Sequence, residues 1–294
     1  MTEQEYLMFL GCAIPYRVSA YEISARKVMK KLGVKIVEMP EFNCCGLPVD
    51  PVSHETMLIL AARNLAMAEQ KGLDIVALCP GCAGTLKKVN KMLKEDLALR
   101  EKINNHLREA GLEFKGTVNV KHILQMLTED VGLEKIKNAV VNPLTKVKVA
   151  EHNGCHILRP KGYIGFDDPE DPKTLKTLIE ATGATCLDYM DETQCCGAPS
   201  VGVNDKIALA LARDKLSHIK KVDAQALITI CPFCHIMYDT NELRIERMFN
   251  EVYGIPVLHY PQLLGLAMGI PAEELAFKDL RVDCSKVLKQ ACEG

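Results

Sequence analysis

Ten of the thirteen cysteines fall into two copies of one arrangement. Each copy has a lone cysteine, then an adjacent Cys-Cys-Gly, then a Cys-x-x-Cys. The first copy consists of Cys12, Cys44, Cys45, Cys79 and Cys82, and the second of Cys155, Cys195, Cys196, Cys231 and Cys234. Five thiolates are one more than a tetrahedral zinc ion or an ordinary iron–sulfur cube requires. The pattern therefore predicts two cysteine-rich metal centres in one chain.

The near-constant offset between the copies indicates a duplicated domain. Cys44 and Cys195 are 151 positions apart, and Cys79 and Cys231 are 152 positions apart. A long helical pattern and a His-x-x-Gln-x-Leu segment follow each Cys-x-x-Cys. The chain has 294 residues, so each half is long enough to bury a core of its own. We place the first domain at residues 1–140 and the second at 141–294, with the boundary in the Pro143-containing segment 132–146.

Short apolar runs alternate with amphipathic helical patterns in both halves, which predicts an α/β fold with parallel sheets. We expect two tandem duplicated domains, each a small parallel sheet flanked by helices, related by a pseudo-twofold axis. Predicted strands cover residues 6–10, 34–37, 75–78, 147–150, 184–187 and 227–230, and predicted helices 17–31, 57–70, 174–181 and 206–220. Each cysteine group then follows strand ends, and ligands of open α/β sheets bind at that edge.

Composition excludes several classes of function. The chain is 48% hydrophobic, as a globular protein is, and its net charge of −2 argues against a nucleic-acid binder. No apolar run approaches the roughly 18 residues of a membrane span. The acidic start lacks the features of a signal peptide, so we expect a cytoplasmic protein. Disulfides are uncommon in that compartment, which favours metal binding by these cysteines.

The spacing of the cysteines suits a multi-iron cluster. A Cys-x-x-Cys at a helix start turns two thiolates toward one centre, and the helix N-terminus favours their charge. Neighbouring side chains of extended backbone point to opposite sides. Adjacent cysteines therefore reach one metal only through a turn, or reach two metals of a cluster. Gly46 and Gly197 are free to adopt the positive φ of such a turn.

Three other readings remain open from the residues alone. Two structural zinc sites would leave one thiolate of each group unused, and thiol–disulfide exchange would leave the lone and adjacent cysteines unexplained. The third reading is that the cysteines are buried by coincidence. Iron–sulfur clusters account for the whole pattern, and we favour them. The cysteines outside the pattern, predicted not to be ligands, are Cys186, Cys284 and Cys292.

Other polar residues near the cysteines are weaker candidates. His156 and His235 directly follow cluster cysteines, and His152 lies three positions before Cys155. A hydrogen-bonding or proton-donating role beside a cluster and an ordinary structural role fit these histidines equally well. No catalytic side chain is predicted, since the clusters themselves would carry the chemistry. For an anionic substrate the first choices as binding residues are Arg159 and Lys87.

The duplicated pattern resembles the CCG-domain family over nearly the whole chain. Within that family the sequence is similar to the B subunits of methanogen heterodisulfide reductases. The segments that carry this likeness are Cys-His-Ile-Leu-Arg-Pro at 155–160, Gly-Phe-Asp-Asp-Pro at 165–169, Gln-Cys-Cys-Gly-Ala-Pro at 194–199 and His-Tyr-Pro-Gln-Leu-Leu-Gly at 259–265.

The resemblance implies a specific oxidoreductase. Each five-cysteine group would hold one non-cubane [4Fe-4S] cluster, and the substrate, the mixed disulfide of coenzyme M and coenzyme B, would lie between the two clusters. Partners would be a flavin-containing A subunit and a ferredoxin-like C subunit, joined to a hydrogenase or formate dehydrogenase in an electron-bifurcating complex of methanogenesis. The chain lacks glycine-rich nucleotide motifs, so it needs an external electron donor.

Two further classes of function share these features. The first is an iron–sulfur electron-transfer subunit of a flavoprotein that oxidises glycolate, lactate or glycerol phosphate. The second is a zinc-stabilised scaffold.

Overall fold

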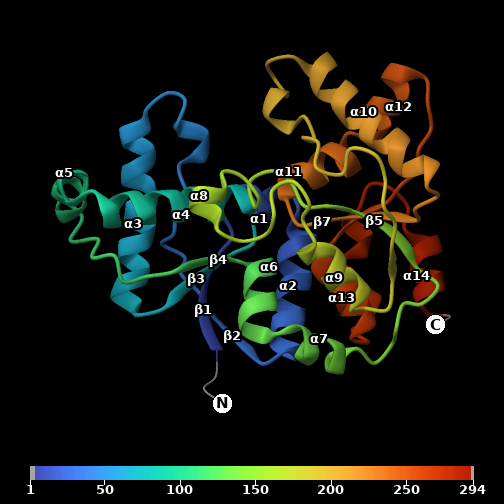
Figure 1. Cartoon of the computed structure of the whole chain (residues 1–294), viewed down its shortest axis with the longest axis horizontal. Coiled ribbons are helices and arrows are strands. Elements are labelled where there is room, and N and C mark those ends of the chain that lie inside the picture. Colours follow the sequence, from blue (N-terminus) through green and yellow to red (C-terminus); the bar gives the residue numbers. More distant parts are fainter. Residues whose placement is uncertain (1–3, 293–294) are drawn as a thin grey trace.

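The computed structural model describes residues 4–292, which form two four-stranded parallel sheets of the same topology (Figure 1). The first sheet has the order β2-β1-β3-β4 and the second β6-β5-β7-β8. Their strands are β1 (Gln4–Phe9), β2 (Val34–Val37), β3 (Asp74–Ala77), β4 (Val120–His122), β5 (Lys148–His152), β6 (Thr185–Cys186), β7 (Ala226–Thr229) and β8 (Val257–His259). The predicted α/β class and tandem duplication are confirmed.

Helices connect and flank the strands. Those of the first half are α1 (Ile14–Arg17), α2 (Ser19–Lys31), α3 (His54–Lys71), α4 (Pro80–Glu95), α5 (Leu97–Arg108), α6 (Ile123–Met126) and α7 (Leu133–Ala139). Those of the second half are α8 (Lys161–Ile164), α9 (Thr174–Glu180), α10 (Asp205–Lys221), α11 (Pro232–His235), α12 (Glu242–Phe249), α13 (Tyr260–Ala267) and α14 (Ser285–Cys292). The equivalent helices α3 and α10 begin after equivalent caps, because the side chains of Ser53 and Asn204 each accept a hydrogen bond from a first-turn N–H.

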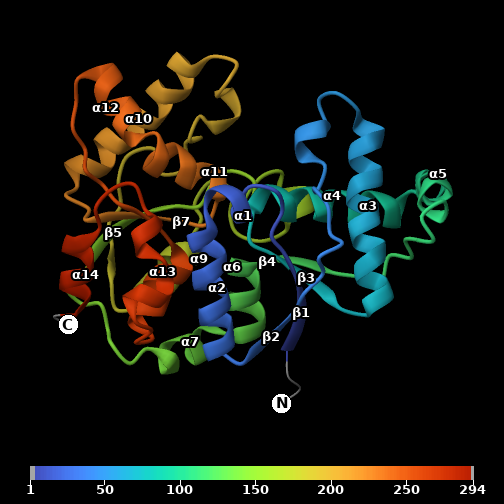
Figure 2. The same cartoon turned by 180° about the vertical axis from the view of Figure 1, so that it is seen from behind.

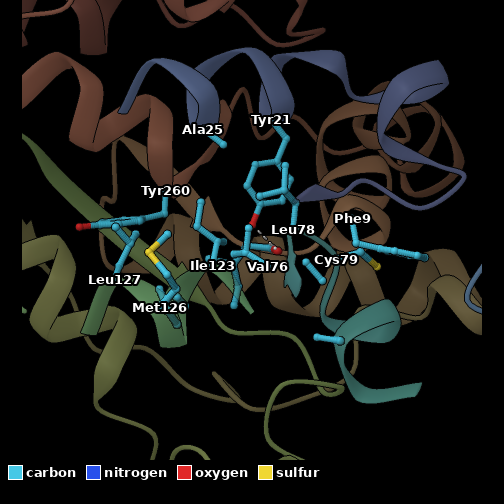
Figure 3. Close-up of a cluster of buried hydrophobic side chains, with 14 of the residues drawn as sticks. Phe9, Tyr21, Ala25, Val76, Leu78, Cys79, Ile123, Met126, Leu127 and Tyr260 are labelled. Atoms are coloured by element: carbon cyan, nitrogen blue, oxygen red, sulfur yellow. Dashed lines mark hydrogen bonds between the residues drawn. The ribbon is translucent and has the colours of Figure 1, made fainter. Parts of the chain in front are cut away.

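The two halves share one large hydrophobic core, although each half is long enough to bury a core of its own. Helices α2 and α13 lie side by side between the sheets in both views (Figures 1 and 2). The largest cluster of buried apolar residues includes members of both halves, and a smaller one lies within the second half. Figure 3 shows Tyr260 of α13 against Met126 and Leu127 of the first half. The hydroxyl of Tyr21 in α2 also donates a hydrogen bond to the carbonyl of Ile230, at 2.9 Å.

Two segments differ from their predicted form. The expected boundary segment 132–146 contains α7, whose Ile136 is fully buried, so that the proposed boundary at 140/141 falls directly after a packed helix. The long helix expected after Cys234 is interrupted by a π-helical turn at Ile236–Thr240. Asp239 in this turn is buried and accepts hydrogen bonds from the backbone of Arg281 and Val282. The turn thereby ties the C-terminal segment to the second sheet.

The shared core predicts cooperative unfolding of both sheets. Tyr260→Ala should lower the free energy of unfolding by about 3–5 kcal/mol, because it removes a buried aromatic ring that contacts both halves. Hydrogen exchange measured by mass spectrometry should show loss of protection in β1–β4 and in β5–β8 together. Tyr16→Ala is the matched control, since that ring is 87% exposed. Loss of protection in one sheet alone would contradict the shared core.

Candidate metal centres

Strand ends bring the five cysteines of the first group together. Cys12 follows β1, Cys44 and Cys45 follow β2, and Cys79 and Cys82 follow β3 and open α4. The thiols of Cys44 and Cys45, of Cys45 and Cys82, and of Cys82 and Cys79 lie close enough to shift one another's pKa values. The thiolate of Cys12 lies close enough to influence Cys44 electrostatically. The carboxyl edge of the first sheet therefore carries one compact sulfur group, which we call the first site.

The second group repeats this arrangement at the second sheet. Cys155 follows β5, Cys195 and Cys196 follow β6, and Cys231 and Cys234 follow β7 and open α11. Here successive pairs of thiols influence one another's pKa values through the whole group, from Cys155 through Cys195, Cys196 and Cys234 to Cys231. This second site and the first site match the two groups that the spacing predicts.

A glycine turn explains how adjacent cysteines serve one site. Gly46 and Gly197 have φ of 92° and 84°, a left-handed conformation that favours glycine. In both turns the glycine N–H lies 3.4 Å from the sulfur two residues earlier, Cys44 or Cys195. A Cβ at Gly197 would lie 2.5 Å from the backbone oxygen of Ala208, so the turn also packs tightly against α10.

The lone cysteines are preceded by glycines that leave room for the sulfurs. A Cβ added to Gly11 would lie 2.7 Å from the sulfur of Cys82, and one added to Gly154 would lie 3.6 Å from that of Cys234. Both glycines have positive φ. On this side each site is therefore lined by glycine backbone, and the cysteine sulfurs occupy the space that a side chain there would need.

The protonation pattern of the sulfurs fits a metal-binding group. Hydrogen bonds from neighbouring thiols lower the pKa of Cys45 to about 3 and that of Cys195 to about 2, whereas the pKa values of Cys44 and Cys155 are raised. Each site thus already stabilises a thiolate, the form that binds metal. A donor set of sulfur alone suits iron–sulfur clusters and zinc. Each sheet edge gathers five cysteines, more than zinc uses, so the residues fit a multi-iron cluster.

Both sites have a buried side and an open side. Cys45, Cys79 and Cys82 are buried, whereas Cys12 is exposed and Cys44 is half-buried. A hollow of ≈400 Å³ lies beside Cys12 and Cys44. In the second site, Cys196 and Cys234 are buried, and the other three cysteines are partly exposed. A ligand can therefore reach each sulfur group from one direction.

The two sites are neighbours. A Cβ at Gly84, two residues after Cys82, would lie 3.2 Å from the carbonyl oxygen of His156, one residue after Cys155. The ring of Tyr21 lies between the sites, and burial together with the thiolates of Cys231 and Cys79 raises its pKa well above the usual value. Tyr21 belongs to the shared core, so the packing of the halves also fixes the relation of the two sulfur groups.

The histidines singled out in the sequence have different surroundings. His156 is exposed, and its Nδ1 lies 3.3 Å from the sulfur of Cys155. His235 is buried, stacks on His259 with ring centres 4.2 Å apart, and directs Nε2 toward Asp239 at 3.6 Å. Burial lowers the pKa of His235 to about 3. Only His156 of these two has a sulfur contact among the interactions seen in residues 4–292.

The candidate substrate residues Lys87 and Arg159 hold the loop around α8. Lys87 is half-buried and donates to the side chain of Gln125 and to the carbonyl of Ile164, at 2.5 and 2.8 Å. Burial lowers its pKa to about 8. Arg159 is exposed and donates to the carbonyl of Pro169 at 2.7 Å. Their substrate role stays a prediction.

The cysteines predicted not to be ligands lie in other places. Cys186 is buried in β6, Cys284 is buried in the C-terminal segment, and Cys292 is exposed at the end of α14. Burial raises the pKa values of Cys186 and Cys284, as for small apolar core residues. The division of the thirteen cysteines into ligands and spectators stays a prediction.

Sequence reasoning missed Lys215 and gave His152 too little weight. Lys215 is fully buried in α10 and donates to the backbone carbonyls of Asp191 and Glu192. The signal in the sequence was its place on the apolar face of the helix, next to Leu216 and three residues after Ala212. His152 ends β5, and one of its ring nitrogens lies within 4.8 Å of the sulfurs of Cys196 and Cys234.

Comparison with known proteins places the chain in a family. The model of the CCG cysteine-rich domain matches residues 6–87 and 149–239, the two segments that carry the sulfur groups. The chain belongs to the CCG cysteine-rich domain family. The resemblance inferred from the cysteine spacing is confirmed.

Two relatives of this chain are named as subunits of reductases. The B subunit of the ferredoxin/F420H2-dependent CoB–CoM heterodisulfide reductase of Methanosarcina acetivorans is 38% identical over 276 residues, which cover 92% of this chain and 91% of the relative. The 8-methylmenaquinol:fumarate reductase membrane anchor subunit of Wolinella succinogenes is 31% identical over 289 residues, covering 97% and 99%. In residues 4–292 of this CCG protein, no helix has the length and apolarity to cross a membrane.

A solved structure supports the fold. A hypothetical protein from Helicobacter pylori superimposes with a TM-score of 0.78 at 16% identity. The match covers 96% of this chain and 53% of the Helicobacter chain, so the CCG protein spans about half of that longer protein.

The glycine turn gives a testable prediction. Gly197→Ala should destabilise the protein more than Gly202→Ala. Both positions have positive φ, which costs about 1–2 kcal/mol for a residue with a Cβ. A Cβ at Gly197 also clashes with backbone, whereas one at Gly202 has nothing within 4 Å. Urea unfolding measures both costs, and equal costs would contradict the tight packing of the turn.

Proposed function

We propose that this CCG protein is the catalytic B subunit of a CoB–CoM heterodisulfide reductase, which reduces the mixed disulfide of coenzyme M and coenzyme B at two non-cubane [4Fe-4S] clusters. The observation that carries the proposal is the pair of five-sulfur sites on neighbouring sheet edges. The relatives named as B subunits of heterodisulfide reductases support it over most of the chain.

The cysteines of each site would hold one cluster, and the clusters, when bound, supply the electrons that break the disulfide bond. The protein itself determines where the two sites lie. The shared core fixes the two sites next to each other, and their exposed sides are marked by Cys12 and Cys155. The two sulfurs of the substrate are bonded to each other. Two sites in a fixed relation can therefore bind both sulfurs at once without a further loss of conformational entropy.

The substrate's charge points to basic residues near the sites. Coenzyme M carries a sulfonate and coenzyme B a phosphate, so both ends of the mixed disulfide are anionic. Arg159 is exposed four residues after Cys155, and its guanidinium is held by the carbonyl of Pro169. Lys87 on α4 is more deeply buried, and its ammonium group donates to the carbonyl of Ile164. Arg159 is therefore the stronger candidate for the anion contact.

Electrons must come from partner proteins. We propose a flavin-containing A subunit and a ferredoxin-like C subunit, joined to a hydrogenase or formate dehydrogenase. The names of the relatives support membership of a multi-subunit enzyme, since each is the B subunit of such a reductase.

A second candidate is an electron-transfer subunit that binds no disulfide. It would pass electrons to or from a flavoprotein, such as one acting on glycolate, lactate or glycerol phosphate. The Wolinella relative favours this class, because its name assigns it to a fumarate reductase. Reduction of the mixed disulfide by the chemically reduced, iron-replete protein separates the two candidates, since only the first performs it.

The metal content is the first test. Protein purified without oxygen should contain about eight iron and eight sulfide per chain, from two four-iron clusters. Elemental and sulfide analysis measures both. Stoichiometric zinc with little iron in a native preparation would contradict the proposal.

Cysteine substitutions test the ligand assignment. Cys234→Ala should remove about half of the iron and destabilise the protein, because cluster binding is coupled to folding. Cys284→Ala is the control, since that cysteine is also buried but lies outside the sulfur groups. Loss of iron from the Cys284 variant would show that the set of ten ligands is wrong.

Kinetics test the substrate contact. Arg159→Ala should raise the KM for the mixed disulfide roughly ten- to hundredfold, because a charged hydrogen bond contributes about 1.5–3 kcal/mol. Iron content should stay unchanged. Arg247→Ala is the control, because Arg247 is an exposed arginine of α12. An unchanged KM at full iron content would exclude Arg159 from the substrate site.

A further inference from the structure

The second site contains a buried charge that the first site lacks. Helices α3 and α10 begin at equivalent caps, Ser53 and Asn204, and eleven residues further on they carry Asn64 and Lys215. Both side chains are completely buried. The two positions are structurally equivalent, and only one of them holds a cation.

Both residues hold the loop that leads to the adjacent cysteines. Asn64 accepts a hydrogen bond from the backbone N–H of Asn43 and donates to the carbonyl of Cys44, at 3.0 and 3.2 Å. Lys215 donates to the carbonyls of Asp191 and Glu192, at 2.5 and 2.9 Å. Asn64 holds its loop with a neutral amide, so a buried cation is not a general requirement at this position of the fold. The ammonium of Lys215 therefore adds something that the loop does not require.

A second difference lies at the ends of the first strands. β1 ends at Phe9 and β5 at His152, and each residue pairs with the equivalent position of the next strand, Ala77 and Thr229. The ring of Phe9 packs on Phe42, so the first site has an apolar wall there.

The imidazole of His152 faces the second sulfur group instead. Nδ1 lies 3.4 Å from the carbonyl of Glu192. Nε2 is buried without a hydrogen-bond partner, and a nitrogen of this ring lies within 4.8 Å of the sulfurs of Cys196 and Cys234. The second site therefore has a polar wall where the first has a phenyl ring.

The acidic groups nearby do not cancel the charge of Lys215. The side chain of Asp191 is 44% exposed and lies 3.3 Å from His218, and that of Glu192 is partly exposed, so water screens both. Glu151 is buried, and its pKa is raised to about 8, which leaves it protonated at neutral pH. The ammonium acts through the protein interior, where charges interact more strongly than in water.

We propose that the cluster of the second site has a higher reduction potential than the cluster of the first, and that Lys215 and His152 set this difference. Adding an electron makes a cluster more negative, so a buried cation and a polar contact at its sulfurs favour the reduced form. The inference rests on the proposed function only in requiring an iron–sulfur cluster at each site. An electron from an external donor then reduces the cluster of the second site before that of the first.

The test is a redox titration with dithionite, followed by electron paramagnetic resonance on the full chain, with iron and sulfide measured in each sample. The wild-type protein should show two unequal midpoint potentials. Lys215→Met should lower the higher potential and leave the lower one in place. Lys221→Met is the control, because Lys221 is exposed at the end of the same helix and should change neither potential.

His152→Phe introduces the residue that the first site has, and it should lower the same potential while Lys215 remains. If Lys215→Met loses the second cluster, the potential that disappears should be the higher one. A single shared potential in the wild type, a change in the lower potential, or survival of the higher potential after loss of the second cluster would overturn the inference. A wild-type protein without iron would overturn the proposed function as well, so the two failures are distinguishable.

Discussion

The packing of α2 against α13 is the constraint on which the rest of the molecule depends. Neither sheet has a complete core without it, because α2 is buried by both halves and Tyr260 packs into the first half from the second. The same contact places the ring of Tyr21 between the two sulfur groups. Burial of apolar surface, the dominant favourable term in folding, thus also sets the geometry of the two sulfur groups.

Much of the fold and of the site could be predicted from the sequence. The parallel sheets, the repeat and the sulfur groups follow from strand-length apolar runs and cysteine spacing, since such groups must lie where parallel strands end. The shared core could not be predicted, because the amphipathic pattern of residues 17–31 shows that one helix face is buried but does not identify what covers it. The π turn at Ile236–Thr240 also escaped prediction, because Asp239 is stabilised there by backbone from a segment about 40 residues away.

Duplication has preserved the framework of the two sites and changed their surroundings. The glycine turns at Gly46 and Gly197 have similar φ values, 92° and 84°, and make the same contact to sulfur. The residues around them differ, with Asn64 and Phe9 at one site and Lys215 and His152 at the other. Backbone geometry is fixed by the need to gather five sulfurs, whereas the side chains behind them remain free to tune each site. Symmetry of ligands therefore does not imply equality of the two centres.

The unequal burial of the cysteines has a consequence for how the protein matures. In the first site Cys79 and Cys82 are buried, whereas Cys12 is exposed to solvent. Since the core is common to both halves, both sulfur groups depend on the packing of the whole chain. With clusters of the proposed kind, iron and sulfide would enter from the exposed side and reach the inner sulfurs last. The same opening would admit dioxygen, so the route of assembly would equally be the route of oxidative damage.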